Sequence, residues 1–269
     1  MLLIETLNSE TLNELNQLVQ KWSPEKKTLV VFSGPSGVGK GTLLTALKTG
    51  TSTYGIGYSG EPWRHFETTI SATTRHKRKG ETDGIEYHFI DLEVFESYIR
   101  NDAFLEYKSS GSGDLYGTLK GEVERIHRLH LLPVLEIETE GKKELEKLAD
   151  VYNIVNLFIL PPSNFDEAKI RQLKSKAGMF MQGNPTLQQL LLALNDDTLS
   201  HQVLTLYERL NSRSSENMEK RLLRLAKAVK ELQEFPHYDV VIVNDTIQNA
   251  TPKLKQVFEM VYHCLICNK

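Results

Sequence analysis

The sequence predicts an α/β protein whose core is a mainly parallel sheet flanked by helices. Four short apolar runs, rich in β-branched and aromatic residues, have the composition of buried parallel strands: 28–34, 131–138, 155–162 and 239–245. Stretches with helical spacing lie between them, as expected where helices connect parallel strands. The first run ends at Gly34 and residues 40–47 can open the next helix, so the glycine-rich segment GPSGVGKGT at 34–42 joins a strand to a helix.

Composition narrows the class of protein. The 269 residues, of which 40% are hydrophobic, are enough for one large core with attached subdomains. A formal net charge of −3 argues against nucleic acid or an anionic membrane as a general partner. Cys264 and Cys267 form one CxxC without the second pair of a zinc site, and so few cysteines indicate a reducing compartment. No apolar run approaches the roughly 20 residues that span a bilayer, and the first residues lack a secretory signal, so we expect a cytoplasmic protein.

The first 26 residues read as a helical appendage that ends near Pro24. Its apolar positions recur at helical spacing: Leu12, Leu15, Leu18, Val19 and Trp22. This stripe either packs on the body of the protein or binds a partner, and packing is the interpretation that we favour.

Residues 34–42 have the pattern of a phosphate-binding loop. In GxxxxGK, small residues let backbone N–H groups converge on phosphate, and the Lys40 ammonium can reach the β and γ phosphates. The pattern predicts a P-loop NTPase-type fold in which ATP is bound by Gly34, Pro35, Ser36, Gly37, Val38, Gly39, Lys40, Gly41 and Thr42. The serine or threonine that usually ligates Mg²⁺ after the lysine is replaced by Gly41, with Thr42 one place later. We therefore expect phosphates and water to hold Mg²⁺, without a protein ligand, as in the nucleoside monophosphate kinases that this GKGT variant resembles.

A second anion site is predicted by ISATTRHKRKGETDGIEYHF at 70–89. Its functional groups are a hydroxyl, two guanidiniums and a phenol, a set suited to one base and one dianionic phosphate: Ser71, Arg75, Arg78 and Tyr87. Composition alone would favour a solvated basic turn. The order of motifs favours the anion site, because SATTR, an arginine three residues on, GExDGxxYHF, FLEY and YGT resemble guanylate kinases. The resemblance runs from the phosphate loop to IVND near residue 245.

The resemblance implies a set of residues that bind GMP: Ser71, Arg75, Arg78, Tyr87, Glu106, Tyr116, Thr118, Glu136 and Glu138. The two arginines and Tyr87 would bind the phosphate, while Glu106 would read the guanine edge together with Ser71 and Thr118. The chemistry of Glu106 agrees, because guanine presents two adjacent donors that one carboxylate accepts together, whereas adenine presents a bare N1 acceptor. Without the FLEY context, Glu106 would read mainly as a solvated charge at the end of a strand.

Two further segments lie near the implied substrates. LEIETEG at 135–141 resembles the family's strand beside GMP, and we expect Glu136 and Glu138 to share one strand face there. Glu140 stands where the family often has glutamine. Asn244 follows the last strand and either contacts the adenine of ATP, as the resemblance implies, or simply ends the strand in an Asn-Asp turn.

The lid over ATP has two open placements. After LPPS at 160–163 the family continues into a helix whose arginines close over the ATP phosphates, but a long insertion, 164–206, follows here. In the first placement the lid residues are Arg171 with Lys174 or Lys176. In the second they lie in LYERLNSRSSENMEKRL and are Arg209, Arg213 and then Arg221. We favour the second because arginines four apart followed by EKRL match the family's pattern, although the interval to Arg221 is shorter than in the family.

The insertion itself has an apolar helical stripe: Leu187, Leu190, Leu191 and Leu194. It predicts an added helical hairpin that packs on the lid or forms a homo-oligomer surface. A second insertion near 50–69 lengthens the link before SATTR.

The predicted organisation is the appendage 1–26 followed by a guanylate kinase-like domain, 27–269. The core would comprise 27–70, 119–163 and 222–269, with a GMP-binding subdomain at 71–118 and a helical lid with its insertion at 164–221. The resemblance implies transfer of the γ-phosphoryl group of ATP, with Mg²⁺, to GMP, and these catalytic residues: Lys40, Arg75, Arg209, Arg213 and Arg221. Two other classes stay open. They are a noncatalytic guanylate-kinase-like interaction module, against which the intact phosphate loop argues, and a kinase of another small phosphorylated substrate, against which the guanine-reading set argues.

Overall fold

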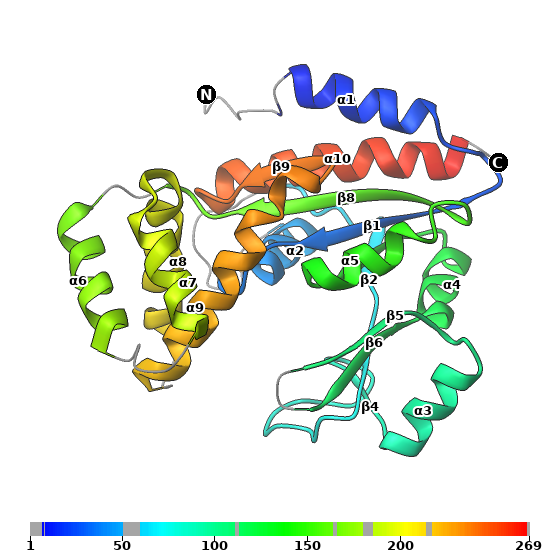
Figure 1. Ribbon diagram of the computed structural model, residues 1–269. Coiled ribbons are helices and arrows are strands. Elements are labelled where there is room, and N and C mark those ends of the chain that lie inside the picture. The colour runs from blue at the N-terminus through cyan, green and yellow to red at the C-terminus, as the bar shows by residue number, and fades with distance from the viewer. Residues whose placement is uncertain are drawn as a thin grey trace. The chain divides into compact units, whose positions relative to one another are not determined.

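A five-stranded sheet carries the fold (Figure 1). The computed structural model describes residues 7, 9–50, 60–110, 113–163, 166–179, 185–213 and 217–267. The strand order is β2 (Phe66–Thr68), β7 (Leu132–Glu136), β1 (Lys27–Ser33), β8 (Tyr152–Leu160) and β9 (Val240–Val243). β1 and β2 pair with β7 in parallel, and β8 pairs with β9 in parallel. The predicted α/β fold is confirmed, and the four apolar runs are β1, β7, β8 and β9.

Burial of the central strand explains its continuous apolar run. All four residues from Leu29 to Phe32 in β1 are 0% exposed. A strand with one solvated face would alternate apolar and polar residues, so both faces of β1 are covered. On one side Phe32 packs edge-on against Phe258 of α10 (Ile247–Cys267), with ring centroids 6.4 Å apart.

The expectation that Glu136 and Glu138 share a strand face is wrong. β7 ends at Glu136, and α5 (Thr139–Glu146) begins three residues later with Glu138 as its N-cap. A carboxylate at a helix N-terminus is stabilised by the unpaired N–H groups and the helix dipole. Within LEIETEG the strand therefore ends, and the helix begins, earlier than the alternating pattern predicts.

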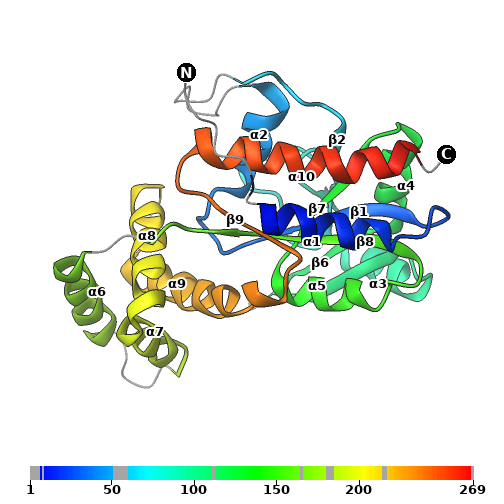
Figure 2. The same cartoon turned by 90° about the horizontal axis from the view of Figure 1, so that it is seen from above.

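The chain divides into two compact units. The first consists mainly of Ser33–Pro62 and Leu157–Gln256. Its helices include α2 (Lys40–Thr49), α6 (Glu167–Met179), α7 (Pro185–Asn195), α8 (Asp197–Arg213) and α9 (Met218–Gln233). The predicted insertion forms α6, α7 and the first part of α8, which lie side by side (Figure 2). It is thus larger than a hairpin. Leu187, Leu190 and Leu194 are buried where α7 packs on α8 and α9.

The second unit consists of Ser9–Phe32, Trp63–Asn156 and Val257–Lys269. It contains a four-stranded sheet of order β4 (His88–Phe89), β3 (Ala72–Thr73), β6 (Leu115–Leu119) and β5 (Phe104–Ser109). Helix α3 (Leu92–Arg100) packs on this sheet through Phe95, which stacks on Phe104 with centroids 4.5 Å apart. The chain returns to the large sheet through α4 (Lys120–Arg128), which precedes β7.

Within the predicted N-terminal appendage lies α1 (Ser9–Gln20). Leu15 is 1% exposed, and after the helix Lys26 Nζ donates to the carbonyl oxygen of Ala149 at 2.9 Å. This segment therefore packs on its own unit. The predicted insertion near 50–69 lies in part, at 51–59, outside the described residues. Of the helices in the described ranges, none combines the length and apolar character needed to cross a bilayer.

Candidate active site

The phosphate loop connects β1 to α2, and its shape requires glycine. Gly34 and Gly39 have positive φ angles of 146° and 97°. A Cβ at Gly34 would lie 2.6 Å from the carbonyl oxygen of Ile159, and a Cβ at Gly39 would lie 2.7 Å from Nδ2 of Asn244. Neither the backbone angle nor the space admits a side chain. The backbone of the loop therefore forms the surface that a phosphate would approach.

Lys40, the first residue of α2, folds back across this loop. Its Nζ donates to the carbonyl oxygen of Gly34 at 2.7 Å, so the ammonium joins the two ends of GxxxxGK. A phosphate oxygen is a charged acceptor and forms a stronger bond to an ammonium than a carbonyl does. At the next position, a Cβ on Gly41 would meet nothing within 4 Å. Space is therefore available for the side chain of the usual serine or threonine, so crowding does not explain the glycine at this position.

Two side chains fasten the middle of the loop to β9 and α8. Asn244, which is 5% exposed, donates from Nδ2 to the carbonyl oxygen of Val38 at 2.7 Å. Arg209 donates to the same carbonyl at 3.0 Å and to the carbonyl oxygen of Asn244 at 2.8 Å. Arg209 and Asn244 therefore lie together at the loop, although they are 35 residues apart in the chain.

Helix α9 contacts Ser36, the third residue of the loop, with side chains of opposite charge. Arg224 donates from Nη2 to the Ser36 hydroxyl at 2.9 Å. The backbone N–H of Ser36 donates to Oε2 of Glu231 at 3.3 Å, and Glu231 is 6% exposed. The sequence reasoning assigned neither residue.

The remaining candidate lid residues lie elsewhere. Arg221 donates from Nη1 to Oδ1 of Asn211. The side chain of Arg213 lies outside the described part of the chain. Arg171, Lys174 and Lys176 of the first placement are on α6, where Lys176 Nζ lies 3.4 Å from the hydroxyl of Tyr207. One feature of the sequence pointed to Arg224. The interval before Arg221 is shorter than in the family, and Arg224 lies three residues, almost one helical turn, further on.

In the second unit, Arg75 lies in a cluster with two tyrosines. Glu81 accepts from both Nη1 and Nη2 of Arg75, at 3.0 and 2.8 Å, and also from the backbone N–H of Arg78 at 2.8 Å. This bidentate bond raises the pKa of the Arg75 guanidinium and holds the pKa of the Glu81 carboxyl below its usual value. The guanidinium also lies 5.5 Å from the ring centre of Tyr87. Glu81 lies within the GExDG motif, but it is not among the site residues predicted from the sequence.

Tyr87 and Tyr116 complete this cluster. Their ring centroids are 5.7 Å apart, and Tyr116 hydrogen-bonds to Arg75. Burial, assisted by Tyr116, raises the pKa of Tyr87, so its phenol remains a donor at neutral pH. The side chain of Arg78 is exposed. The structure therefore places Arg75, Tyr87 and Tyr116 together, with Glu81 added.

A buried carboxylate lies on the adjoining strand pair. Glu106 of β5 stands opposite Thr118 of β6, and the Thr118 hydroxyl donates to Oε1 of Glu106 at 2.6 Å. Glu106 is 7% exposed, and this burial raises its pKa, opposed by the Thr118 bond and by the charge of Lys108. A Cβ at Gly141 of α5 would lie 2.9 Å from Oε2, so α5 closes one side of the carboxylate. The alternative of a solvated charge at a strand end does not fit this environment.

The charge of Lys108 acts on both Glu106 and Glu138. Residues 106 and 108 face the same side of β5, since side chains alternate along a strand. Lys108 forms an ion pair with Glu138 and stands opposite Tyr116 in the β5–β6 register.

Glu136 is exposed at the end of β7. Ser71 lies just before β3, and its carbonyl oxygen accepts from the backbone N–H of His88 at 2.9 Å.

These features define a class of protein. A glycine-rich loop with its lysine between a buried parallel strand and a helix is a nucleotide phosphate site. A separate small sheet carries an arginine–tyrosine cluster and a buried carboxylate, which suit the phosphate and the base of a second nucleotide. The fold, with these two groups of residues, is typical of the P-loop kinases that act on nucleoside monophosphates.

Comparison with known proteins gives the family. The guanylate kinase family model matches residues 26–189. The guanylate kinase of Mycoplasmopsis pulmonis (strain UAB CTIP) is 33% identical, over 86% of this chain and 94% of that protein. That of Mycoplasmopsis synoviae (strain 53) is 31% identical, over 87% and 94%. The crystal structure of guanylate kinase from Anaplasma phagocytophilum has the same fold, with a TM-score of 0.52 and 22% identity over 88% of this chain and 86% of that one. The chain belongs to the guanylate kinase family, which confirms the resemblance stated from the motifs.

Proposed function

We propose that this protein transfers the γ-phosphoryl group of ATP to GMP and releases ADP and GDP, with Mg²⁺ as the metal. The observation that carries the choice of GMP is the buried Glu106–Thr118 pair on the small sheet. A buried carboxylate with one oxygen already bonded to a hydroxyl needs donors for its remaining lone pairs. The adjacent N1–H and amine of guanine supply them, and adenine does not.

The GMP phosphate would bind at the arginine–tyrosine cluster. Glu81 holds both outer nitrogens of the Arg75 fork, so the guanidinium is oriented before substrate arrives. The phenols of Tyr87 and Tyr116 add neutral donors beside it. Arg78, whose side chain is exposed, would approach the phosphate from solvent.

The ATP phosphates would bind at the phosphate loop. Lys40 would exchange the Gly34 carbonyl for a phosphate oxygen, and Arg224 adds a second cation through Ser36. Arg209 and Asn244, which meet at Val38, would lie beside the adenine. We propose Arg224, rather than Arg221, as the lid arginine of α9, because Arg224 contacts the loop and Arg221 contacts Asn211.

The chemical step needs no nucleophile from the protein. An oxygen of the GMP phosphate forms the new bond to the γ-phosphorus, the bond from that phosphorus to its bridging oxygen breaks, and ADP leaves with the bonding electron pair. Lys40, Arg75 and Arg224 would stabilise the charge on the transferring group. The metal, when bound, would supply further charge neutralisation. With Gly41 after the lysine, phosphate oxygens and water would be its ligands.

We also propose self-association through the insertion and a cytoplasmic location. The exposed side chains of Met179 and Leu192, 74% and 71% exposed, are candidates for self-association through the insertion. Cys264 is not in a disulfide, which fits a reducing, cytoplasmic setting. Light scattering of wild type and of Leu192→Ser would test the first point, since a dimer through this face would dissociate in the variant.

An assay of ADP release tests the proposed function. MgATP is mixed with GMP, dGMP, AMP, CMP or UMP, and Lys40→Ala serves as the blank. We expect strong turnover with GMP, little with AMP and none above background in the blank. Binding of nucleotides without turnover would overturn the proposal in favour of an interaction module.

A further inference from the structure

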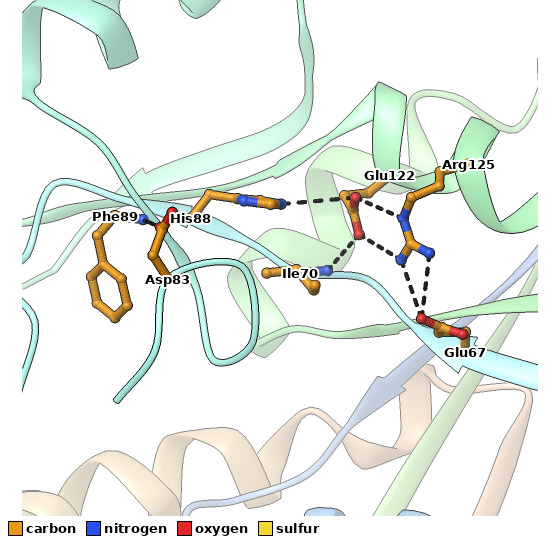
Figure 3. A network of polar contacts seen from close by, with 7 residues as sticks. All are labelled: Glu67, Ile70, Asp83, His88, Phe89, Glu122 and Arg125. Atoms are coloured by element: carbon orange, nitrogen blue, oxygen red, sulfur yellow. Dashed lines mark hydrogen bonds and ion pairs between the residues drawn. The ribbon is translucent and has the colours of Figure 1, made fainter. Parts of the chain in front are cut away.

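The chain has to cross from the large sheet to the small sheet just before Ser71. At Thr69 it still belongs to the large sheet, because its N–H donates to the carbonyl oxygen of Val134 at 3.0 Å, and at Ala72 it has entered β3. Ile70 lies between the two ladders. Its backbone N–H donates to Oε2 of Glu122 on α4 at 3.0 Å (Figure 3). A side chain thus supplies the acceptor that no strand provides at this point.

Glu122 is itself held firmly. It is 8% exposed, and Arg125 binds it with both Nε and Nη2 at 3.0 Å. Arg125 also reaches Oε1 of Glu67 on β2, at 3.3 and 3.4 Å (Figure 3). Burial disfavours the charged form of Glu122, but the bonds from Arg125 and from the Ile70 N–H outweigh it and lower its pKa. The acceptor is therefore a fixed carboxylate at neutral pH.

A second arm of this network reaches the tyrosine side of the GMP site. Nε2 of His88 lies 3.8 Å from Oε1 of Glu122. His88 directly follows Tyr87, and its backbone N–H donates to Ser71 at 2.9 Å. Asp83 accepts from the N–H of Phe89 at 2.8 Å and so fixes the far end of β4 (Figure 3). One carboxylate thus contacts the residue before Ser71 and the residue after Tyr87.

We propose that Glu122 is a positioning residue for GMP, acting through the Ile70–Ser71 backbone and His88 to set the places of the Ser71 hydroxyl and the Tyr87 phenol. The inference rests on the proposed function and adds a residue that touches no substrate atom. Glu122 would act by fixing the positions of these binding groups. A misplacement of about 1 Å in a binding group can cost on the order of 100-fold in rate. The alternative is that Glu122 only stabilises the fold.

The variant Glu122→Gln separates these two roles. It keeps the size of the side chain and one acceptor oxygen but loses the charge that Arg125 and His88 face. Glu124→Gln is the matched control, because Glu124 is on the same helix and pairs with the exposed Lys27. The readouts are GMP and ATP dissociation constants from calorimetry, the melting temperature, and the same constants in a Ser71→Ala background.

We expect Glu122→Gln to weaken GMP binding about tenfold, as for the loss of one charged hydrogen bond, with ATP binding within about twofold of wild type. In the Ser71→Ala background the same change should weaken GMP binding only about threefold, because the part of its effect that acts through the Ser71 hydroxyl is already lost and only the part that acts through Tyr87 remains. Glu124→Gln should match wild type. Should Glu122→Gln fail to fold, Arg125→Gln tests the same network, with GMP binding expected to fall several-fold.

The inference is overturned if a folded Glu122→Gln protein, whatever its melting temperature, binds GMP like wild type, or if its full effect persists without the Ser71 hydroxyl. Because binding is measured directly, this result is distinct from a failure of the proposed function. If only the proposed function failed, wild type would bind GMP, Glu122→Gln would bind it more weakly, and neither protein would release ADP. Absence of GMP binding by wild type would overturn both.

Discussion

Replacing Glu106 by glutamine should remove the preference for GMP while stabilising the empty protein. The change keeps the shape of the side chain but replaces one carboxylate oxygen by an amide NH₂. In the structure the Thr118 hydroxyl already occupies Oε1 at 2.6 Å, and Gly141 approaches Oε2. Guanine needs two acceptors from this group, and glutamine has one oxygen to share between the base and Thr118.

The size of the loss in GMP turnover follows from this number of acceptor oxygens. At least one guanine donor loses a charged acceptor and faces an NH₂ donor instead. Together these effects amount to about 2 to 4 kcal/mol, or roughly 30- to 1,000-fold in kcat/KM for GMP. AMP makes no such bond, so its kcat/KM should change little. The ratio of GMP to AMP turnover should therefore fall by nearly the whole factor.

Stability should change in the opposite direction. Burial raises the pKa of Glu106 above its ordinary 4.5. A carboxyl with a raised folded-state pKa binds more protons in the folded state than in the unfolded state between the two pKa values. The free energy of unfolding therefore falls as the pH rises through that window. Glutamine has no charge to bury, so Glu106→Gln should have a higher melting temperature than wild type at pH 7.5, and the difference should shrink as the pH is lowered.

Two measurements check this reasoning: ADP release with GMP and with AMP, and thermal unfolding of the nucleotide-free protein at two pH values. Thr118→Val is a useful companion, since it removes the hydroxyl and leaves the charge. An unchanged GMP to AMP ratio in Glu106→Gln would refute the base-reading role. A lower melting temperature at pH 7.5 would refute the argument from burial.

Three further predictions concern the phosphate loop. Lys40→Ala should reduce turnover at least 1,000-fold, because the charge of Lys40 acts on the transferring phosphoryl group. Calorimetry should show GMP binding within about twofold of wild type. Turnover near that of wild type would exclude this role for Lys40. Arg224→Met should lower kcat about 100-fold through lost charge stabilisation, whereas Arg221→Met should stay within about threefold in the same assay; the reverse order would return the lid role to Arg221. Gly39→Ala should weaken ATP binding at least tenfold because its Cβ would lie 2.7 Å from Asn244 at a φ of 97°; an ATP titration with wild-type affinity would show that the loop can yield.

The sequence was most informative where one local signal decides the structure. The run from Leu29 to Phe32 followed by GPSGVGKGT predicts a buried strand, a phosphate loop and a helix, and all three are present. The signal is local because burial on both faces removes the alternation of a strand, and because glycine alone tolerates the loop's backbone angles.

Contacts that depend on the reach of a side chain between elements could not be predicted. In α9 both Arg221 and Arg224 fit the helical pattern, and only the packing of the helix decides which one faces Ser36. Glu122 reads as one more polar residue of α4, since nothing local shows that Ile70 lacks a strand partner. Glu138 was misplaced for a related reason. Its alternating neighbours fit a strand, but its carboxylate also stabilises the first turn of α5, and the helix prevails.

Gly41 has a kinetic consequence for the metal. The residue after Lys40 has no hydroxyl, although a Cβ there would meet nothing within 4 Å. A loop hydroxyl would give the ion a protein ligand at this position, whereas we expect glycine to leave the ion to the triphosphate and water. Mg²⁺ should then enter and leave with ATP, so the initial rate should follow the concentration of the MgATP complex and be insensitive to free Mg²⁺ once that complex is saturating.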